Sequence, residues 1–437
     1  MSQDDDSLPS SRFARFRKLA GLTASLSADA LQRGVKKLAG SEPDPGLSRE
    51  TAEKLATTLG EMKGVAMKLG QALSMDPEAF PPEARAVLAR LQNAAPPMPY
   101  AHVREVVEEE LGEPPESAYA SFDETPLAAA SLGQVHAAVT HGGQAVVVKV
   151  QYPRVADALK SDLDNLGLVV KALGANQKLD VKKYYEEVKR ELVHELDYRR
   201  EARLAREYAE ALAPFPDLAA PAPVDALTAG RVLTLERFEG PTLKKLLEPD
   251  AAVDDDTRFR VGRQLVRNTF GPFLHSGRMH VDPHPGNFIV LPDGRLGVLD
   301  FGSIKQFSPL FVDVNRAMYR VGVEGRAAGV DVVGLSRQVG FDISVSDDET
   351  AELVHAIVDR ACRAMREPEW DYGADDSQKL LEQLFKERFG TFLKVRPPEE
   401  APLFFRAVGG LTQNLKLLRA KGPFRAAFVE LLALAGT

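Results

Sequence analysis

The stretch His280–Asn287, which reads HVDPHPGN, decides the fold together with the triplet DFG at Asp300–Gly302. Within the first stretch, Asp282 and Asn287 stand five positions apart. The intervening residues Phe288–Val298 form two short apolar runs around Pro-Asp-Gly, which is typical of a β-hairpin turn. Two motifs with carboxylate and amide side chains therefore flank a predicted hairpin.

An Asp placed five residues before an Asn, with DFG shortly afterwards, is the pattern of kinase active sites. Phosphoryl transfer needs Mg²⁺, which takes oxygen ligands from one or two protein groups, phosphates and water. The pattern predicts that Asp300 and Asn287 bind Mg²⁺ and that Asp282 orients or deprotonates the attacking hydroxyl or water. Each motif alone is common in ordinary loops, so the prediction depends on the complete set.

A second interpretation uses the histidines of the same stretch. His280, Asp282 and His284 alternate along the chain, so a strand would place three metal ligands on one side. Pro283 and Pro285 are poorly compatible with a regular strand. We therefore expect the histidines to pack the loop.

Further upstream, Gln134–Val139 and Ala145–Val150 are apolar runs joined by a Gly-Gly turn, which predicts a second hairpin. Lys149 lies near the end of this hairpin, where a kinase places the lysine that binds the α- and β-phosphates. A lysine there can equally be a surface residue. The strand predicted at Arg231–Glu236 ends where kinases bind adenine through backbone groups, so Glu236 is a candidate for that contact.

Two features depart from an ordinary protein kinase. The glycine-rich phosphate loop is absent, and AAASLGQ at Ala128–Gln134 occupies its place. Alanine resists positive φ, so we expect altered nucleotide handling, although the stretch could also be a simple turn. After Gly302 the chain enters a predicted helix without an APE motif, so the segment that docks peptide substrates is missing.

These motifs resemble the UbiB/AarF-type atypical kinase-like family over roughly Thr51 to Phe307. Four stretches carry the resemblance: KLGQ at Lys68–Gln71, AAASLGQVH from Ala128, ELDYRREA at Glu195–Ala202, and HVDPHPGN with DFG. The resemblance implies an α+β, two-lobed protein-kinase-like fold with an N-terminal helical extension and a mostly helical C-terminal lobe. The alanine-rich loop implied to cover the nucleotide comprises Ala128, Ala129, Ala130 and Ser131.

The resemblance also implies roles for single residues. Glu201 is implied to be the partner of Lys149. Residues implied to meet near the active site are Lys68, Gln71, Glu195 and Asp197. Lys68 and Gln71 share one helix face, and that helix would block peptide substrates. Without the resemblance, Lys68 would be read as a surface lysine with its stem on apolar surface.

The implied function is Mg²⁺-dependent binding and hydrolysis of ATP to ADP, in support of isoprenoid quinone or related lipid biosynthesis or transport at a membrane. The implied partners are the nucleotide, a quinone-like lipid or membrane surface, and lipid-biosynthesis proteins. A small-molecule phosphotransferase of the aminoglycoside or choline kinase type is one alternative, disfavoured by the KLGQ and alanine stretches. A non-catalytic nucleotide- or lipid-binding regulator is another, disfavoured by the complete Asp282, Asn287 and Asp300 set.

The length of 437 residues fits several segments. We expect a disordered tail and basic helix over 1–47, a helical extension over 48–112, and kinase-like lobes over 113–240 and 241–437. Within these segments we expect a helix over 101–111, ended by Gly112, and a long charged helix over 181–212. A net charge of -8 does not indicate a global preference for nucleic acid, so we expect no nucleic-acid partner. With neither a signal peptide nor a transmembrane segment recognised, we expect a cytoplasmic protein, peripheral at a membrane if the basic stretch 11–39 is an amphipathic anchor. That stretch could equally pack on its own protein.

Overall fold

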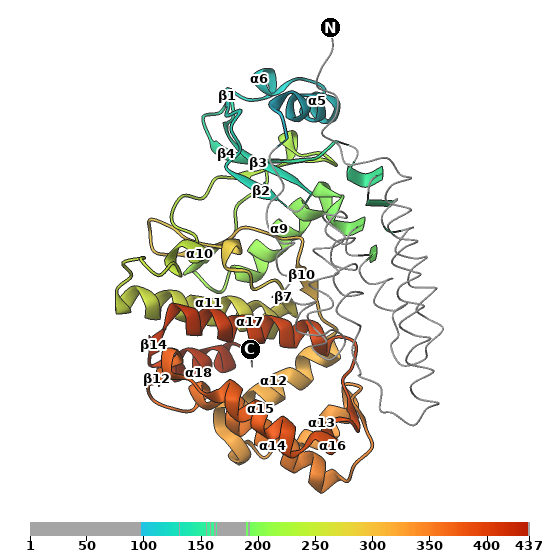
Figure 1. The fold of residues 1–437 in the computed structure, drawn as a ribbon, viewed down its shortest axis with the longest axis vertical. Helices are drawn as coiled ribbons and strands as arrows, with labels where there is room; N and C mark the ends of the chain where they lie inside the picture. Colours follow the sequence, from blue (N-terminus) through green and yellow to red (C-terminus); the bar gives the residue numbers. More distant parts are fainter. Residues whose placement is uncertain are drawn as a thin grey trace, which may run out of the picture. The chain divides into compact units, whose positions relative to one another are not determined.

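The computed structural model describes residues 98–130, 132–153, 155–157, 159–160, 163, 189–190 and 193–435. These residues form two compact units. Figure 1 colours the chain by residue number, from blue near the N-terminus to red at the C-terminus. The first unit comprises the described residues up to Arg200 together with Val224–Leu235, and the second comprises Glu201–Pro223 and the described residues from Glu236 onward. The predicted helix at 11–39, Lys68, Gln71 and Ser131 lie outside the described residues.

The first unit is built on a sheet in the order β1-β3-β4-β6, with β2 paired to β3. Its strands are β1 Ser121–Phe122, β2 Ala128–Ala130, β3 Gly133–Val139, β4 Ala145–Gln151 and β6 Val232–Glu236. The expected hairpin is β3–β4, and its turn uses Gly143 at φ 81°, a conformation that glycine adopts without strain. The short helix α6 spans Pro115–Ala118, and the 3₁₀ helix η1 spans Asp225–Leu227.

Helix α5 (Tyr100–Leu111) packs on this sheet and ends at Gly112, as its sequence predicts. Its apolar residues recur every three or four positions, whereas those of β4 alternate, so each element presents one apolar face. The buried core that they share includes Val103, Val106, Val107, Val146, Val148 and Val150. Helical and strand periodicity therefore combine into one core.

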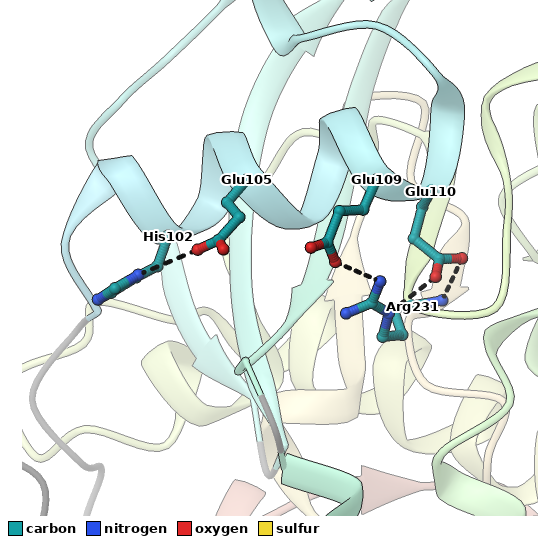
Figure 2. A network of polar contacts seen from close by, with 5 residues as sticks. All are labelled: His102, Glu105, Glu109, Glu110 and Arg231. Carbon is teal, nitrogen blue, oxygen red and sulfur yellow. Dashed lines mark hydrogen bonds and ion pairs between the residues drawn. The ribbon is translucent and has the colours of Figure 1, made fainter.

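A network of charged side chains also ties α5 to β6. Arg231, just before β6, donates from Nε to Glu110 and from Nη2 to Glu109, each at 2.7 Å (Figure 2). The backbone N–H of Arg231 adds a bond of 3.2 Å to Glu110. Burial works to raise the pKa of Glu110, but the hydrogen bonds and charge of Arg231 outweigh it and hold that pKa below its usual value.

Two expectations for the first part of the chain are wrong. The alanines Ala128–Ala130 form β2, paired antiparallel with β3, rather than a loop. The long helix expected over 181–212 is broken at Leu196 and Asp197, and α9 begins at Tyr198 and ends at Leu212. The Asp197 carboxylate accepts a 3.1 Å hydrogen bond from the backbone of Arg199, because a short acidic side chain satisfies donors at a helix start.

The second unit is mostly helical, as expected. Besides most of α9, its helices are α10 Leu243–Leu246, α11 Asp255–Ser276, α12 Pro309–Glu324, α13 Val332–Gln338, α14 Asp347–Ala361, α15 Ser377–Glu387, α16 Phe389–Phe392, α17 Ala401–Leu418 and α18 Phe424–Ala435. Its 3₁₀ helices are η2 Pro285–Asn287, η3 Gly325–Ala328, η4 Arg363–Met365 and η5 Tyr372–Ala374. Helices α11 and α17 lie side by side (Figure 1).

Short strands complete the second unit. A three-stranded sheet has the order β5-β9-β8, and three pairs are β7 with β10, β11 with β13, and β12 with β14. The strands are β5 Leu218–Ala219, β7 Arg278–His280, β8 Phe288–Val290, β9 Leu296–Val298, β10 Ile304–Gln306, β11 Asp342–Ile343, β12 Trp370–Asp371, β13 Val395–Arg396 and β14 Lys421–Gly422. Among the described helices, none combines the length and apolar character needed to cross a membrane.

Candidate active site

Two short strands bring the decisive motifs of the second unit together. Strand β7 leads into the HVDPHPGN stretch and pairs antiparallel with β10, which follows DFG, with His280 opposite Ile304. The pairing continues where Val281 N donates to Ser303 O at 3.0 Å. The chain before Asp282 and the chain after Asp300 are therefore neighbours.

The hairpin predicted between the motifs is confirmed as β8–β9, with Gly294 at φ 85° in its turn. Beyond the last pair of the hairpin, Leu299 N donates to Asn287 O at 2.9 Å. Asn287 thus lies opposite the residue that precedes Asp300. The hairpin places the amide and the carboxylate at its open end, as their spacing suggests.

Asp282 and Asn287 are joined directly. Asn287 Nδ2 donates to Asp282 Oδ2 at 2.9 Å, and His284 N donates to Asp282 Oδ1 at 3.3 Å. Because Asn287 donates through Nδ2, its Oδ1 points away from Asp282 and can serve as a ligand for a hard cation. Asp300 Oδ1 accepts from Gly302 N at 3.0 Å, which orients that carboxylate within the DFG turn.

The histidines of the loop have packing roles. His280 is buried, and its Nε2 donates to Asp300 O at 2.6 Å, so it joins the two motifs. His284 Nδ1 accepts from Gly286 N at 3.1 Å and caps η2. In the part of the chain that the structure describes, no group of three or more His, Cys, Asp or Glu side chains is placed to hold a metal. The observed contacts favour packing over the histidine metal site.

Lys149 lies in the first unit on the face of β4 opposite its buried valines. Its Nζ is 5.0 Å from the centre of the Tyr198 ring, a cation–π distance, and Tyr198 is the first residue of α9. Two residues further along β4, Gln151 Nε2 donates to Leu196 O at 2.9 Å. The structure therefore brings the strand of Lys149 to the segment that contains Glu195 and Asp197.

The predicted glutamates of this region differ in burial. Glu195 is half-buried, whereas Glu201 is buried. Glu201 lies in the first turn of α9, where the helix dipole favours a negative charge. It follows Tyr198 by three positions, so the two side chains share one face of the helix.

The alanine stretch is followed by contacts that the sequence reasoning missed. A Cβ on Gly133 would lie 2.1 Å from Val150 O, so only glycine permits this approach of β3 to β4. Gln134 is buried and accepts from Met98 N at 2.9 Å through Oε1, while its Nε2 lies 2.9 Å from His136 Nε2. Burial lowers the pKa of His136. Motif residues after the turn therefore hold the chain just before α5.

Glu236, the candidate for adenine contact, ends β6. Its N–H donates to Ala222 O at 2.8 Å, and Ala222 N approaches its Oε2 at 3.4 Å. The N–H of Glu236 is therefore committed to the Pro214–Pro223 connection. A backbone contact with a nucleotide from this position would therefore fall to its carbonyl group.

Comparison with known proteins supports the identification of these motifs. The profile of the ABC1 atypical kinase-like domain matches residues 90–323 of the chain. The chain belongs to the ABC1 atypical kinase-like family. The match confirms the resemblance to UbiB/AarF-type proteins and the kinase-like α+β fold, and it makes the chain a member of the class of ATP-dependent atypical kinases and ATPases.

Relatives extend the similarity beyond the matched domain. The atypical kinase COQ8B, mitochondrial, of Rattus norvegicus is 30% identical over 92% of this chain and 77% of its own length. The atypical kinase COQ8, mitochondrial, of Saccharomyces cerevisiae is 30% identical over 93% of this chain and 81% of its own. The structure of Rv3197 from Mycobacterium tuberculosis, in complex with erythromycin, has a TM-score of 0.63 and 30% identity, covering 88% of this chain and 96% of that one.

Proposed function

We propose that this protein is a Mg²⁺-dependent ATPase of the UbiB type. Asn287 and Asp300 bind the cation, Lys149 binds the α- and β-phosphates with Glu201 as its partner, and Asp282 orients water. The 2.9 Å bond from Asn287 Nδ2 to Asp282 Oδ2 carries the proposal. That bond leaves Asn287 Oδ1 available as an oxygen donor for a cation and holds the Asp282 carboxylate, which in this proposal would orient the attacking water.

The donor set fits Mg²⁺. Asn287 Oδ1 and the Asp300 carboxylate are hard oxygen donors, and Mg²⁺ is commonly held by one or two such protein groups plus phosphates and water. The bound cation supplies neutralisation of charge on the phosphates. In the reaction, the water oxygen bonds to the γ-phosphorus, the bond to the ADP oxygen breaks, and the water proton passes through Asp282 to solvent.

The chain after the DFG triplet supports an acceptor other than a peptide. It passes from β10 directly to Ser308, whose hydroxyl accepts from Phe311 N at 3.3 Å and caps α12. Little chain remains there to build a peptide-docking segment. We extend the proposal to a role in isoprenoid quinone or related lipid metabolism, with lipid-biosynthesis proteins as partners, from the UbiB resemblance and the COQ8 relatives.

A surface of the second unit supports contact with an anionic membrane. In the stretch 385–396, Phe385, Phe389 and Leu393 recur every four positions and are 40%, 42% and 64% exposed. Four basic residues accompany them, and Arg388 also pairs with Glu352 at 3.6 Å. Exposed apolar side chains beside basic groups are typical of peripheral membrane binding. The 11–39 stretch is a second proposed contact.

The test is phosphate release from MgATP by the full chain, with and without vesicles containing anionic lipid. We expect vesicles to stimulate release, and Asp300→Asn to lower it on the order of 10²- to 10³-fold through loss of a metal ligand. The matched control is Asp293→Asn, since Asp293 is an exposed residue of the β8–β9 turn. Leu393→Ser should reduce only the vesicle stimulation.

Other outcomes would redirect the proposal. Intact nucleotide binding without any phosphate release would refute hydrolysis and favour a regulator. Phosphate transferred to erythromycin, an aminoglycoside or choline would favour a small-molecule phosphotransferase. Equal stimulation of the wild type and Leu393→Ser would remove the 385–396 surface from the proposal.

A further inference from the structure

Helix α17 is a fixed element of the second unit. The Phe404 ring centre lies 5.1 Å from that of Phe273 on α11 and 5.8 Å from that of Phe311 on α12. At its start, Glu400 accepts hydrogen bonds of 2.7 Å from both the backbone N–H and the hydroxyl of Ser308. Because Ser308 caps α12, the start of α17 is tied to the chain that follows β10.

Two side chains of α17 bind the carbonyl groups on either side of Asp282. Arg406 Nε donates to Val281 O at 2.8 Å, and Asn414 Nδ2 donates to Pro283 O at 2.7 Å. Asn414 is 4% exposed, so its bond is shielded from water. The residues before and after Asp282 are thus each anchored to the same helix through their carbonyl groups.

Gly410 lies between these two donors and lets the loop approach the helix. A Cβ at this position would lie 1.9 Å from Pro283 Cγ and 2.2 Å from Pro283 Cβ, far inside contact distance. Arg406, Gly410 and Asn414 are four positions apart in turn, so they share one face of α17. This face combines two donors with a space that fits Pro283.

We propose that Arg406, Gly410 and Asn414 are positioning residues for Asp282. The inference rests on the proposed function only in giving Asp282 its part in the reaction. These three residues lie beyond the matched domain, which ends at residue 323. In this proposal, helix α17, which lies outside the matched domain, positions Asp282, which lies inside it. Displacement of a reacting group by about 1 Å can cost on the order of 10²-fold in rate.

The experiment compares two pairs of matched variants in the full chain. Gly410→Ala is paired with Gly409→Ala, since a Cβ on Gly409 meets nothing within 4 Å. Asn414→Leu is paired with Gln413→Leu, because Gln413 is exposed. Phosphate release is measured per nucleotide bound, so misfolded molecules do not contribute, and hydrogen exchange is measured for the loop at 281–287 and for α17.

We expect Gly410→Ala and Asn414→Leu to lower the rate per bound nucleotide about 10- to 100-fold and to change MgATP affinity less than about threefold. Exchange of the 281–287 amides should rise in both variants, whereas both controls should match the wild type. Unchanged loop exchange with unchanged rate refutes the positioning role and leaves ATP hydrolysis standing. If even the wild type releases no phosphate, hydrolysis fails and the loop exchange alone decides the inference.

Discussion

Lys149 in the first unit and Asp282 in the second are held in place by different means. Lys149 lies within β4, where Val148 and Val150 on either side of it are fully buried. Asp282 lies between β7 and η2, in a loop outside regular secondary structure. The carbonyl groups of its two neighbours are bound by Arg406 and Asn414 of α17, a helix that is distant in the sequence.

The difference predicts how each region fails. The direction of a strand side chain is set by the pleat and by the burial of its neighbours. Loss of apolar contacts should therefore lower the free energy of unfolding while the side chain keeps its direction. A loop interrupted by prolines has no ladder of strand hydrogen bonds, so its backbone depends on individual directed hydrogen bonds. Mutations in the core of the first unit should therefore act through stability, and mutations under the Asp282 loop should act through rate.

The largest effect expected on the first unit comes from Lys149→Met. Loss of the ammonium removes the proposed phosphate contact, so we expect phosphate release to fall on the order of 10²-fold with little change in the free energy of unfolding. Lys160→Met is the control, because Lys160 is exposed. Phosphate release and a urea titration check this, and equal rates in the two variants would contradict the role of Lys149.

Local patterns predicted much of this arrangement. The alternation of Ala145–Val150, the hairpin at Phe288–Val298 and the helix ending at Gly112 are all confirmed, because each depends on neighbouring residues. The motif spacing assigned Asp282 and Asn287 to one site, and the structure joins them by a hydrogen bond that the spacing did not predict. Each of these signals lies within a short stretch of sequence.

What the sequence did not reveal depends on distant contacts. Arg406 and Asn414 donate to carbonyl groups that are 125 and 131 residues away in the sequence. Every residue has a backbone carbonyl group, so the residue types of the loop do not indicate that it is bound in this way. Strands β7 and β10 are too short to show the alternation of apolar and polar residues that marks a strand. They are defined by their antiparallel pairing with each other. The break at Asp197 was hidden by the strongly helical composition around it. The assigned roles of the site residues stay predictions.

An intermediate effect is expected from Val106→Ala in α5. Val106 is 1% exposed in the core of the first unit, so we expect a loss of about 2 kcal/mol of stability there. The rate per bound nucleotide should change less than about threefold. Glu105→Ala, on the exposed side of the same helix, should change neither quantity much. A large fall in rate without a loss of stability would contradict the contrast drawn between the two regions.

The smallest effects separate the two glutamates that bind Arg231 (Figure 2). The side chain of Glu110 is 18% exposed and that of Glu109 is 53% exposed. Water screens the more exposed pair, so Glu109→Gln should cost less than about 0.5 kcal/mol. Glu110→Gln should cost about 1–2 kcal/mol at pH 7, because its partner Arg231 loses a shielded charged hydrogen bond. Hydrogen exchange of the α5 amides measures both.

The pH dependence of stability tests whether the charge of Glu110 accounts for the loss expected in Glu110→Gln. The pKa of Glu110 is lower in the folded protein than its ordinary value of 4.5, so its carboxylate contributes stability that is fully present above that value. The contribution is lost as the pH falls through the lower folded pKa. The wild type and Glu110→Gln should therefore differ at pH 7 and converge progressively below about pH 4.5. A difference that stays constant down to pH 3 would show that packing of the side chain, rather than its charge, holds α5 to β6.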